Sequence, residues 1–161
     1  MTEDTNPLFY NGETYRLNDS IGYLMGQIVS KSSAVVDERM VEFGLTNAQW
    51  KPLLLIQKGH CRTAVELARL SSCDSGAMTR LLDRLEAKGL VRRVRSQEDR
   101  RVVNLELTEE GERAAMVVPY VLADVLNAML LSFSEAEAQQ LKNLLQRLLG
   151  NTCQLAERGA D

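Results

Sequence analysis

Arginine and lysine side chains are concentrated in one short segment of this 161-residue chain. Residues 80–101 contain eight basic and four acidic side chains, so this segment carries +4 and the rest of the chain −7, for a total of −3. Guanidinium groups bind phosphate oxygens, and their planar geometry also suits the O6 and N7 acceptors of guanine. Because a polyanion responds to a local patch more than to the total charge, the segment indicates binding to nucleic acid. The alternative is that these side chains only solvate a helix and a turn.

The second half of this basic segment is predicted to form a β-hairpin. Two β-prone runs, residues 90–95 and 102–107, flank a polar tip that carries Asp99, Arg100 and Arg101. A basic hairpin of this kind can reach the DNA backbone or the minor groove beside a helix that lies in the major groove.

A helix-turn-helix motif is predicted immediately before the hairpin. A capping box at residues 63–66 begins a short helix that ends near residue 70, and a turn over residues 71–74 follows. The second helix covers about residues 75–88 and stops at Gly89. One face of this helix carries small, polar and basic side chains, which suits close approach to the floor of a DNA groove. Four apolar side chains spaced for one helical face are expected to meet the core: Met78, Leu81, Leu82 and Leu85.

The N-terminal part is predicted to be helical as well. A long first helix begins after Asn18 or Asp19, which are good N-caps, and ends at Gly44. A capping box at residues 46–49 begins a second helix, which Pro52 is expected to bend because it removes one backbone hydrogen bond.

The C-terminal third is predicted to be helical and strongly apolar. Thr108 caps a long helix that reaches about Leu131 and that Pro119 should kink, and a capping box at residues 134–137 begins the last helix. These helices carry more apolar surface than a small domain buries alone, which indicates a dimerisation surface or a second helix layer on the same subunit. The stripe of the last helix consists of Leu141, Leu144, Leu145, Leu148 and Leu149.

The order of helices and hairpin resembles the MarR family of winged helix-turn-helix regulators over roughly residues 20–150. The motifs that carry the resemblance are Leu67-Ala68, Ser75 to Leu85, Lys88-Gly89-Leu90-Val91 with Arg93, Asp99-Arg100-Arg101, and Leu107-Thr108 with Gly111. The resemblance implies a mainly α fold with a small β-wing, in a single domain over residues 1–161. It assigns residues 1–45 and 109–161 to a dimerisation lobe and residues 46–108 to a DNA-binding lobe, in a homodimer that binds a pseudo-palindrome.

The resemblance also implies which residues meet double-stranded DNA. Arg101 would enter the minor groove or contact phosphate, and Asp99 would brace it through a salt bridge to Arg101 or Arg93. Arg93 has two possible roles, a phosphate contact or an ion pair at the base of the wing. Arg80 is the candidate for contact with a guanine edge. The full set is Ser75, Gly76, Thr79, Arg80, Arg84, Arg93, Arg95, Ser96, Asp99, Arg100 and Arg101. Asp83 could orient Arg84 or accept from a cytosine amine, or it could be a plain surface charge.

Many members of this family respond to small aromatic acids, so the resemblance implies a repressor that a small aromatic compound, phenolic or carboxylate, releases from DNA. A carboxylate would need a cation and a ring would need an aromatic partner. Six residues could line the pocket: Tyr23, Gln27, Arg39, Trp50, Lys51 and His60. Each could equally be structural. No cofactor and no metal site are expected.

Three functions are alternatives to a ligand-responsive DNA-binding regulator. Cys73 at the start of the second motif helix, where the helix dipole could lower its pKa, suggests a thiol-based redox sensor, but no cysteine lies early in the first helix, where thiol-sensing relatives carry theirs. A winged-helix module that binds only proteins is disfavoured by the basic segment. An enzyme is disfavoured because the chain has one histidine and no nucleophile or phosphate-loop motif. A polar N-terminus without a signal sequence predicts a cytoplasmic protein.

Overall fold

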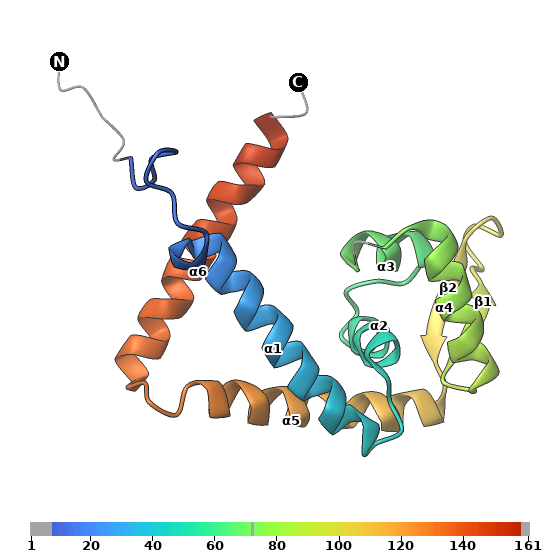
Figure 1. The fold of residues 1–161 in the computed structure, drawn as a ribbon. Helices are drawn as coiled ribbons and strands as arrows, with labels where there is room; N and C mark the ends of the chain where they lie inside the picture. The colour runs from blue at the N-terminus through green and yellow to red at the C-terminus, as the bar shows by residue number, and fades with distance from the viewer. Residues whose placement is uncertain (1–7, 72, 159–161) are drawn as a thin grey trace. The chain divides into compact units, whose positions relative to one another are not determined.

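The computed structural model describes residues 8–71 and 73–158, and it divides into one compact unit up to Val121 and another from Leu122 onwards. The two strands form an antiparallel pair, and all other regular elements are helices (Figure 1). A 3₁₀ turn over Leu17–Asp19 is followed by α1 (Ile21–Val41), α2 (Asn47–Gln57), α3 (Ala64–Leu70), α4 (Ser75–Ala87), β1 (Val91–Arg95), β2 (Val103–Leu107), α5 (Glu109–Met129) and α6 (Glu135–Arg158). The mainly helical fold with a two-stranded wing is the one that the sequence predicted.

Helix starts follow local capping chemistry, with one correction to the sequence predictions. The N-cap of α1 is Ser20, whose hydroxyl accepts from the Tyr23 amide at 3.2 Å, and not Asn18 or Asp19, which belong to the 3₁₀ turn. At α4 the N-cap is Asp74, which accepts from the Ala77 amide at 2.9 Å. A short polar side chain at this position satisfies an amide that the helix cannot.

The predicted capping box at the start of α3 is present. The carboxylate of Glu66 accepts from the backbone N–H groups of Arg62 at 2.7 Å and of Thr63 at 3.0 Å. These two bonds stabilise the charged form and hold the pKa of Glu66 below its usual value. The helix-turn-helix therefore starts at the residue that its sequence motif indicated.

The core of the unit up to Val121 joins the helix-turn-helix to α1, α2 and the first half of α5. Leu81 is only half-buried, whereas the other three residues of the predicted α4 stripe are buried. In α1 burial is confined to Val36 and Met40. The most deeply buried large side chains are Met40, Leu45, Leu53, Leu67, Met78, Leu82, Leu85 and Val118.

The wing pairs β1 with β2 in the predicted antiparallel hairpin. Val91 lies opposite Leu107 and Arg95 opposite Val103. The free edge of β2 continues onto the segment before α3, where the Leu105 amide donates to the Arg62 carbonyl at 2.7 Å. The wing is thus attached to the helix-turn-helix by backbone hydrogen bonds.

The unit from Leu122 onwards contains the C-terminal half of α5 and all of α6. The capping box that begins α6 is confirmed, since the Glu137 carboxylate accepts from the Ser134 amide at 2.8 Å. No residue of α6 is buried. Its exposed apolar side chains are Leu141, Leu144, Leu145, Leu149 and Leu155.

Gly111, in the first turn of α5, permits the closest approach between α5 and the wing. A Cβ at this position would overlap the backbone carbonyl of Leu90, which is rigid. Thr108 fixes the same corner, because its hydroxyl donates to the Gly89 carbonyl and accepts from the Gly111 amide. Gly89 has φ of 67°, the left-handed conformation that favours glycine.

Substitution of Gly111 by alanine is therefore expected to lower the free energy of unfolding by about 1–3 kcal/mol, because the new methyl group forces α5 away from β1. Urea unfolding measures this value. The matched control is Gly150→Ala in α6, where the added methyl group meets no atom within 4 Å and should stabilise the helix slightly. Equal stabilities of the two variants would contradict the packing described for this corner.

Candidate nucleic-acid interface

The N-terminal half of α4 is a surface of small and polar residues. Ser75 and Gly76 are exposed in its first turn, and the Thr79 hydroxyl donates to the Ser75 carbonyl at 2.9 Å. Arg84 folds along its own helix, since its Nε donates to the Arg80 carbonyl at 3.1 Å. Arg80 is exposed, and its guanidinium has no hydrogen-bond or ion-pair partner among the described residues. The exposed face of α4 therefore offers one free guanidinium beside a backbone that another molecule can approach closely.

Arg93 in β1 is held by two carboxylates of α4. Its Nη1 lies 2.8 Å from Asp83 Oδ1 and 2.7 Å from Glu86 Oε2, and its side chain is 30% exposed. The hydrogen bond that Arg93 donates to Asp83 and the charge of Glu86 raise the pKa of Arg93 above its usual value. Of the two roles considered for Arg93, the structure shows the ion pair, and a phosphate contact stays a prediction. The role considered for Asp83 as an orienter of Arg84 does not appear, because Asp83 pairs with Arg93.

A second arginine of the wing is also paired. Arg92 donates from Nη2 and Nε to Glu106 Oε2, at 2.7 and 2.9 Å, across the two strands. Both side chains are well exposed, so this pair adds little stability. It does withdraw one positive charge from the free surface of the wing.

Backbone hydrogen bonds organise the tip of the wing. The Ser96 hydroxyl accepts from the amides of Glu98 and Asp99, at 3.2 and 3.3 Å. Asp99 Oδ1 then accepts from the backbone amide of Arg101 at 2.9 Å. The expected salt bridge from Asp99 to Arg101 or Arg93 does not form among the described residues. Asp99 instead stabilises the tip by accepting a hydrogen bond from a main-chain amide.

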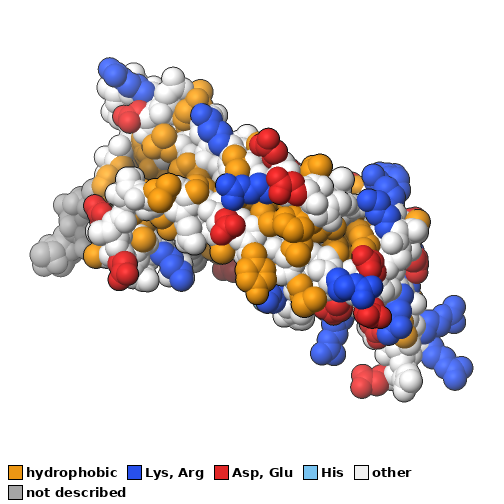
Figure 2. Space-filling view, turned by 90° about the horizontal axis from the view of Figure 1, so that it is seen from below, with side chains coloured by type: hydrophobic (Ala, Val, Ile, Leu, Met, Phe, Trp, Pro, Cys, Tyr) orange, Lys and Arg blue, Asp and Glu red, His pale blue; other side chains and the backbone are white. Residues whose placement is uncertain are grey.

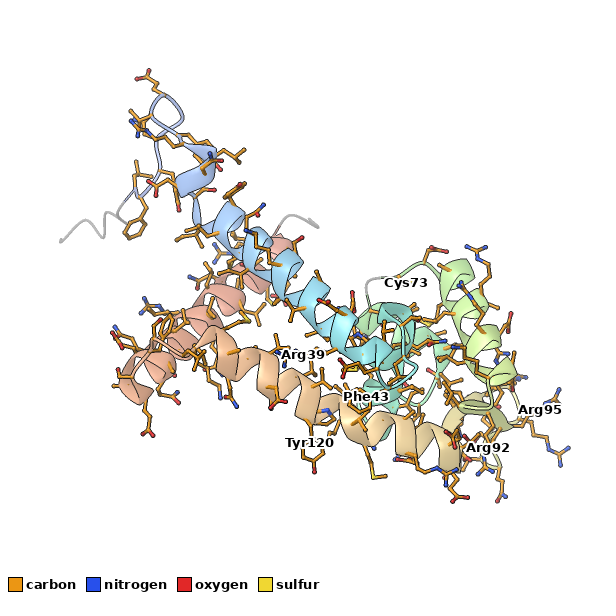
Figure 3. The ribbon with its side chains drawn as sticks, turned by 60° about the horizontal axis from the view of Figure 1, so that its bottom comes forward. Arg39, Phe43, Cys73, Arg92, Arg95 and Tyr120 are labelled. Atoms are coloured by element: carbon orange, nitrogen blue, oxygen red, sulfur yellow. The ribbon has the colours of Figure 1, made fainter. Side chains whose placement is uncertain are left out.

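The bracing of the tip leaves its basic side chains free. Arg95, Arg100 and Arg101 are exposed and have no side-chain partner in the residues that the structure describes. Figure 3 shows Arg95 extending away from the wing. In the space-filling view, arginine and lysine side chains gather over α4 and the wing (Figure 2). Paired and unpaired arginines thus lie side by side on one surface.

The six candidate effector residues differ in burial and in their contacts. Trp50 is buried, and its Nε1 donates to Asp37 Oδ1 at 3.1 Å, while Lys51 Nζ lies 5.6 Å from the centroid of the Trp50 ring. Tyr23 and Arg39 are half-buried, and the other two are exposed. One cavity of about 240 Å³ is lined by residues between 9 and 19, and another of about 350 Å³ lies between α2, β2 and the start of α5. None of the six lines either.

The cysteines occupy three different environments. Cys61 is buried, and burial raises the pKa of its thiol, as does the neighbouring charge of Glu66. Cys73 is half-buried just before α4, and Cys153 is exposed in α6. The high pKa makes Cys61 a poor nucleophile at neutral pH. Within the described ranges no three His, Cys, Asp or Glu side chains cluster in a way that could hold a metal ion.

Comparisons with known proteins agree with this architecture. The MarR family profile matches residues 45–103. The reduced form of MarR from Escherichia coli is 30% identical to this chain, with a TM-score of 0.72 that covers 81% of this chain and 96% of that one. The chain belongs to the MarR family. A crystal structure of a mutant E. coli MarR complexed with operator DNA matches as well, at 31% identity and a TM-score of 0.72, covering 84% of this chain and 99% of that one.

The sequence match to a curated relative is shorter than the structural one. The multiple antibiotic resistance protein MarR of E. coli K12 is 38% identical over 91 residues, which is 56% of this chain and 63% of that protein. The match therefore spans less than two thirds of the relative's length. Among the helices described, none has the length and apolar character needed to cross a membrane.

Proposed function

We propose that this MarR-family chain is a transcriptional regulator that binds double-stranded DNA through α4 and the wing. The observation that carries the proposal is the set of free guanidinium groups on one surface: Arg80, Arg95, Arg100 and Arg101. Guanidinium groups without an internal partner are available to phosphates and base edges. The E. coli relative crystallised with operator DNA supports the same conclusion.

In this proposal α4 lies in the major groove. Its first turn of Ser75, Gly76 and Ala77 allows close approach, and Arg80, one turn further on, reaches a guanine edge. The wing tip lies beside it, where Arg101 enters the minor groove or binds phosphate and Asp99 keeps the tip in shape. Arg95 and Ser96 contact the backbone.

The proposal includes a homodimer that acts as a repressor on a pseudo-palindromic operator. Two copies of α4 and of the wing would bind two half-sites related by two-fold symmetry. The exposed apolar stripe of α6 supports a second copy that covers it. In the other unit, α1 exposes Ile21, Leu24 and Ile28, which a second copy could also cover. A regulator of this kind acts on the chromosome, so we place it in the cytoplasm.

Substitution of Arg101 by alanine is expected to weaken binding to every DNA sequence and to reduce the slope of log K against log salt by about one, because a phosphate contact is lost. Substitution of Arg80 should instead cost about 1–3 kcal/mol on the chain's own upstream DNA and relax specificity at one position. Fluorescence anisotropy over a salt series measures both values.

The control for these two variants is Arg113→Ala, which removes an arginine that pairs with Glu109 and Glu110 at the start of α5. It should leave the affinity and the salt slope unchanged. If the control weakens DNA binding as much as Arg101→Ala does, the roles assigned here are wrong.

The proposal also includes a small aromatic acid that releases the protein from DNA. Its support is family membership, together with Lys51, whose Nζ lies 5.6 Å from the centroid of the Trp50 ring and could hold a carboxylate beside that ring. Trp50 is the single tryptophan, so its fluorescence reports binding without a label. Salicylate is expected to quench this fluorescence and to lower DNA affinity over the same concentration range. Quenching without any change in DNA affinity would exclude salicylate as the effector.

A further inference from the structure

The C-terminal end of α4 is connected to α2 by a polar contact that the DNA-binding role does not use. Lys88, the C-cap of α4, donates from Nζ to Gln49 Oε1 at 3.3 Å. The same oxygen accepts from the Thr46 amide at 3.1 Å and so completes the cap of α2. Gln49 is 6% exposed, whereas Lys88 is an exposed residue. One buried amide oxygen therefore joins the first turn of α2 to the last turn of α4.

This contact changes what Lys88 does within the basic segment. Judged by charge alone, Lys88 belongs with the arginines that would bind phosphate. Its ammonium group instead lies against a buried acceptor of its own chain. A buried amide oxygen that loses a donor is left partly unsatisfied, which is unfavourable. The contact therefore favours one position of the α4 terminus relative to α2.

The geometry of a helix makes this terminus important for DNA reading. Arg80 and Lys88 are eight residues apart, which is about 12 Å along the helix axis. A tilt of about ten degrees at the Lys88 end would displace the backbone at Arg80 by about 2 Å, whereas a productive contact tolerates about 0.5 Å. The N-terminal half of α4 has no comparable polar connection to α2 among the described residues.

We propose that Lys88 and Gln49 form a positioning pair that fixes α4 against α2 and thereby sets how accurately Arg80 meets a base edge. This inference rests on the proposed DNA-binding function and goes beyond it, because Lys88 acts through α4 and does not touch DNA. Two polar contacts of α4 thus have different partners: Asp83 and Glu86 bind Arg93 of the wing, and Lys88 binds Gln49 of α2.

The decisive variant is Lys88→Met, which keeps the length of the side chain and removes the donor. The affinity for the chain's own operator is expected to fall about tenfold, while binding to unrelated DNA and the salt slope stay unchanged. Lys88→Arg should recover most of the loss. A phosphate contact by Lys88 would instead lower affinity for all DNA and reduce the salt slope by about one, and that result would overturn the inference.

The partner residue and a matched control complete the test. Gln49→Glu keeps an acceptor for both donors and should bind the operator at least as well as the wild type. Gln49→Leu should reproduce the loss of operator affinity seen with Lys88→Met, and the double variant should be no worse than Gln49→Leu. Lys58→Met removes the same charge at the other end of α2 and should change nothing.

A measurement without DNA separates this inference from the proposed function. In a double-mutant cycle over Lys88→Met and Gln49→Leu, urea unfolding should show a clear coupling between the two positions. Additive effects would overturn the inference even if the protein binds its operator. A wild-type chain that binds no DNA would overturn the proposed function and the reading role of the pair, whatever the coupling.

Discussion

The surface formed by α4 and the wing depends on one guanidinium held between two carboxylates. Arg93 lies in β1, and Asp83 and Glu86 lie in α4. Their ion pairs therefore connect the wing to the helix that precedes it. The wing has only two strands, and an isolated hairpin is at best marginally stable in water. With Arg93 in place, together with the backbone bond from Leu105 to Arg62, the free arginines at the tip keep a defined position relative to α4.

The arginines of residues 80–101 fall into two groups, those paired with a carboxylate and those left free of one. The positions of the acidic residues decide to which group each arginine belongs. Arg92 and Arg93 meet carboxylates within reach of their side chains. Arg95, Arg100 and Arg101 instead flank a tip in which the carboxylate of Asp99 is occupied by a backbone amide. The acidic residues of the segment therefore do not neutralise it evenly. They leave positive charge at the tip, which is consistent with an acidic total charge and a local affinity for a polyanion.

Local features of this fold could be predicted from the sequence, because capping boxes, glycine stops and strand propensity act over a few residues. The α3 cap at Glu66, the stop at Gly89 and the hairpin were predicted to within a residue or two. Contacts between distant residues could not be predicted in this way. An ion pair of Arg93 was one of two roles considered, but its partner Asp83 was not identified. The contact between Lys88 and Gln49 was not expected either, since both contacts depend on how α4 packs. The effector residues had no local pattern at all, and none of them lines either of the two cavities described above.

We expect the unpaired arginines to contact DNA while the paired ones hold the structure together. Nitrogen-edited NMR of the arginine Nε–H groups tests it directly, with and without operator DNA. The signals of Arg80, Arg95, Arg100 and Arg101 are expected to shift on binding. Those of Arg92 and Arg93 should already show their ion pairs in the free protein and stay in place. Large shifts of Arg92 and Arg93, with the other four unmoved, would contradict it.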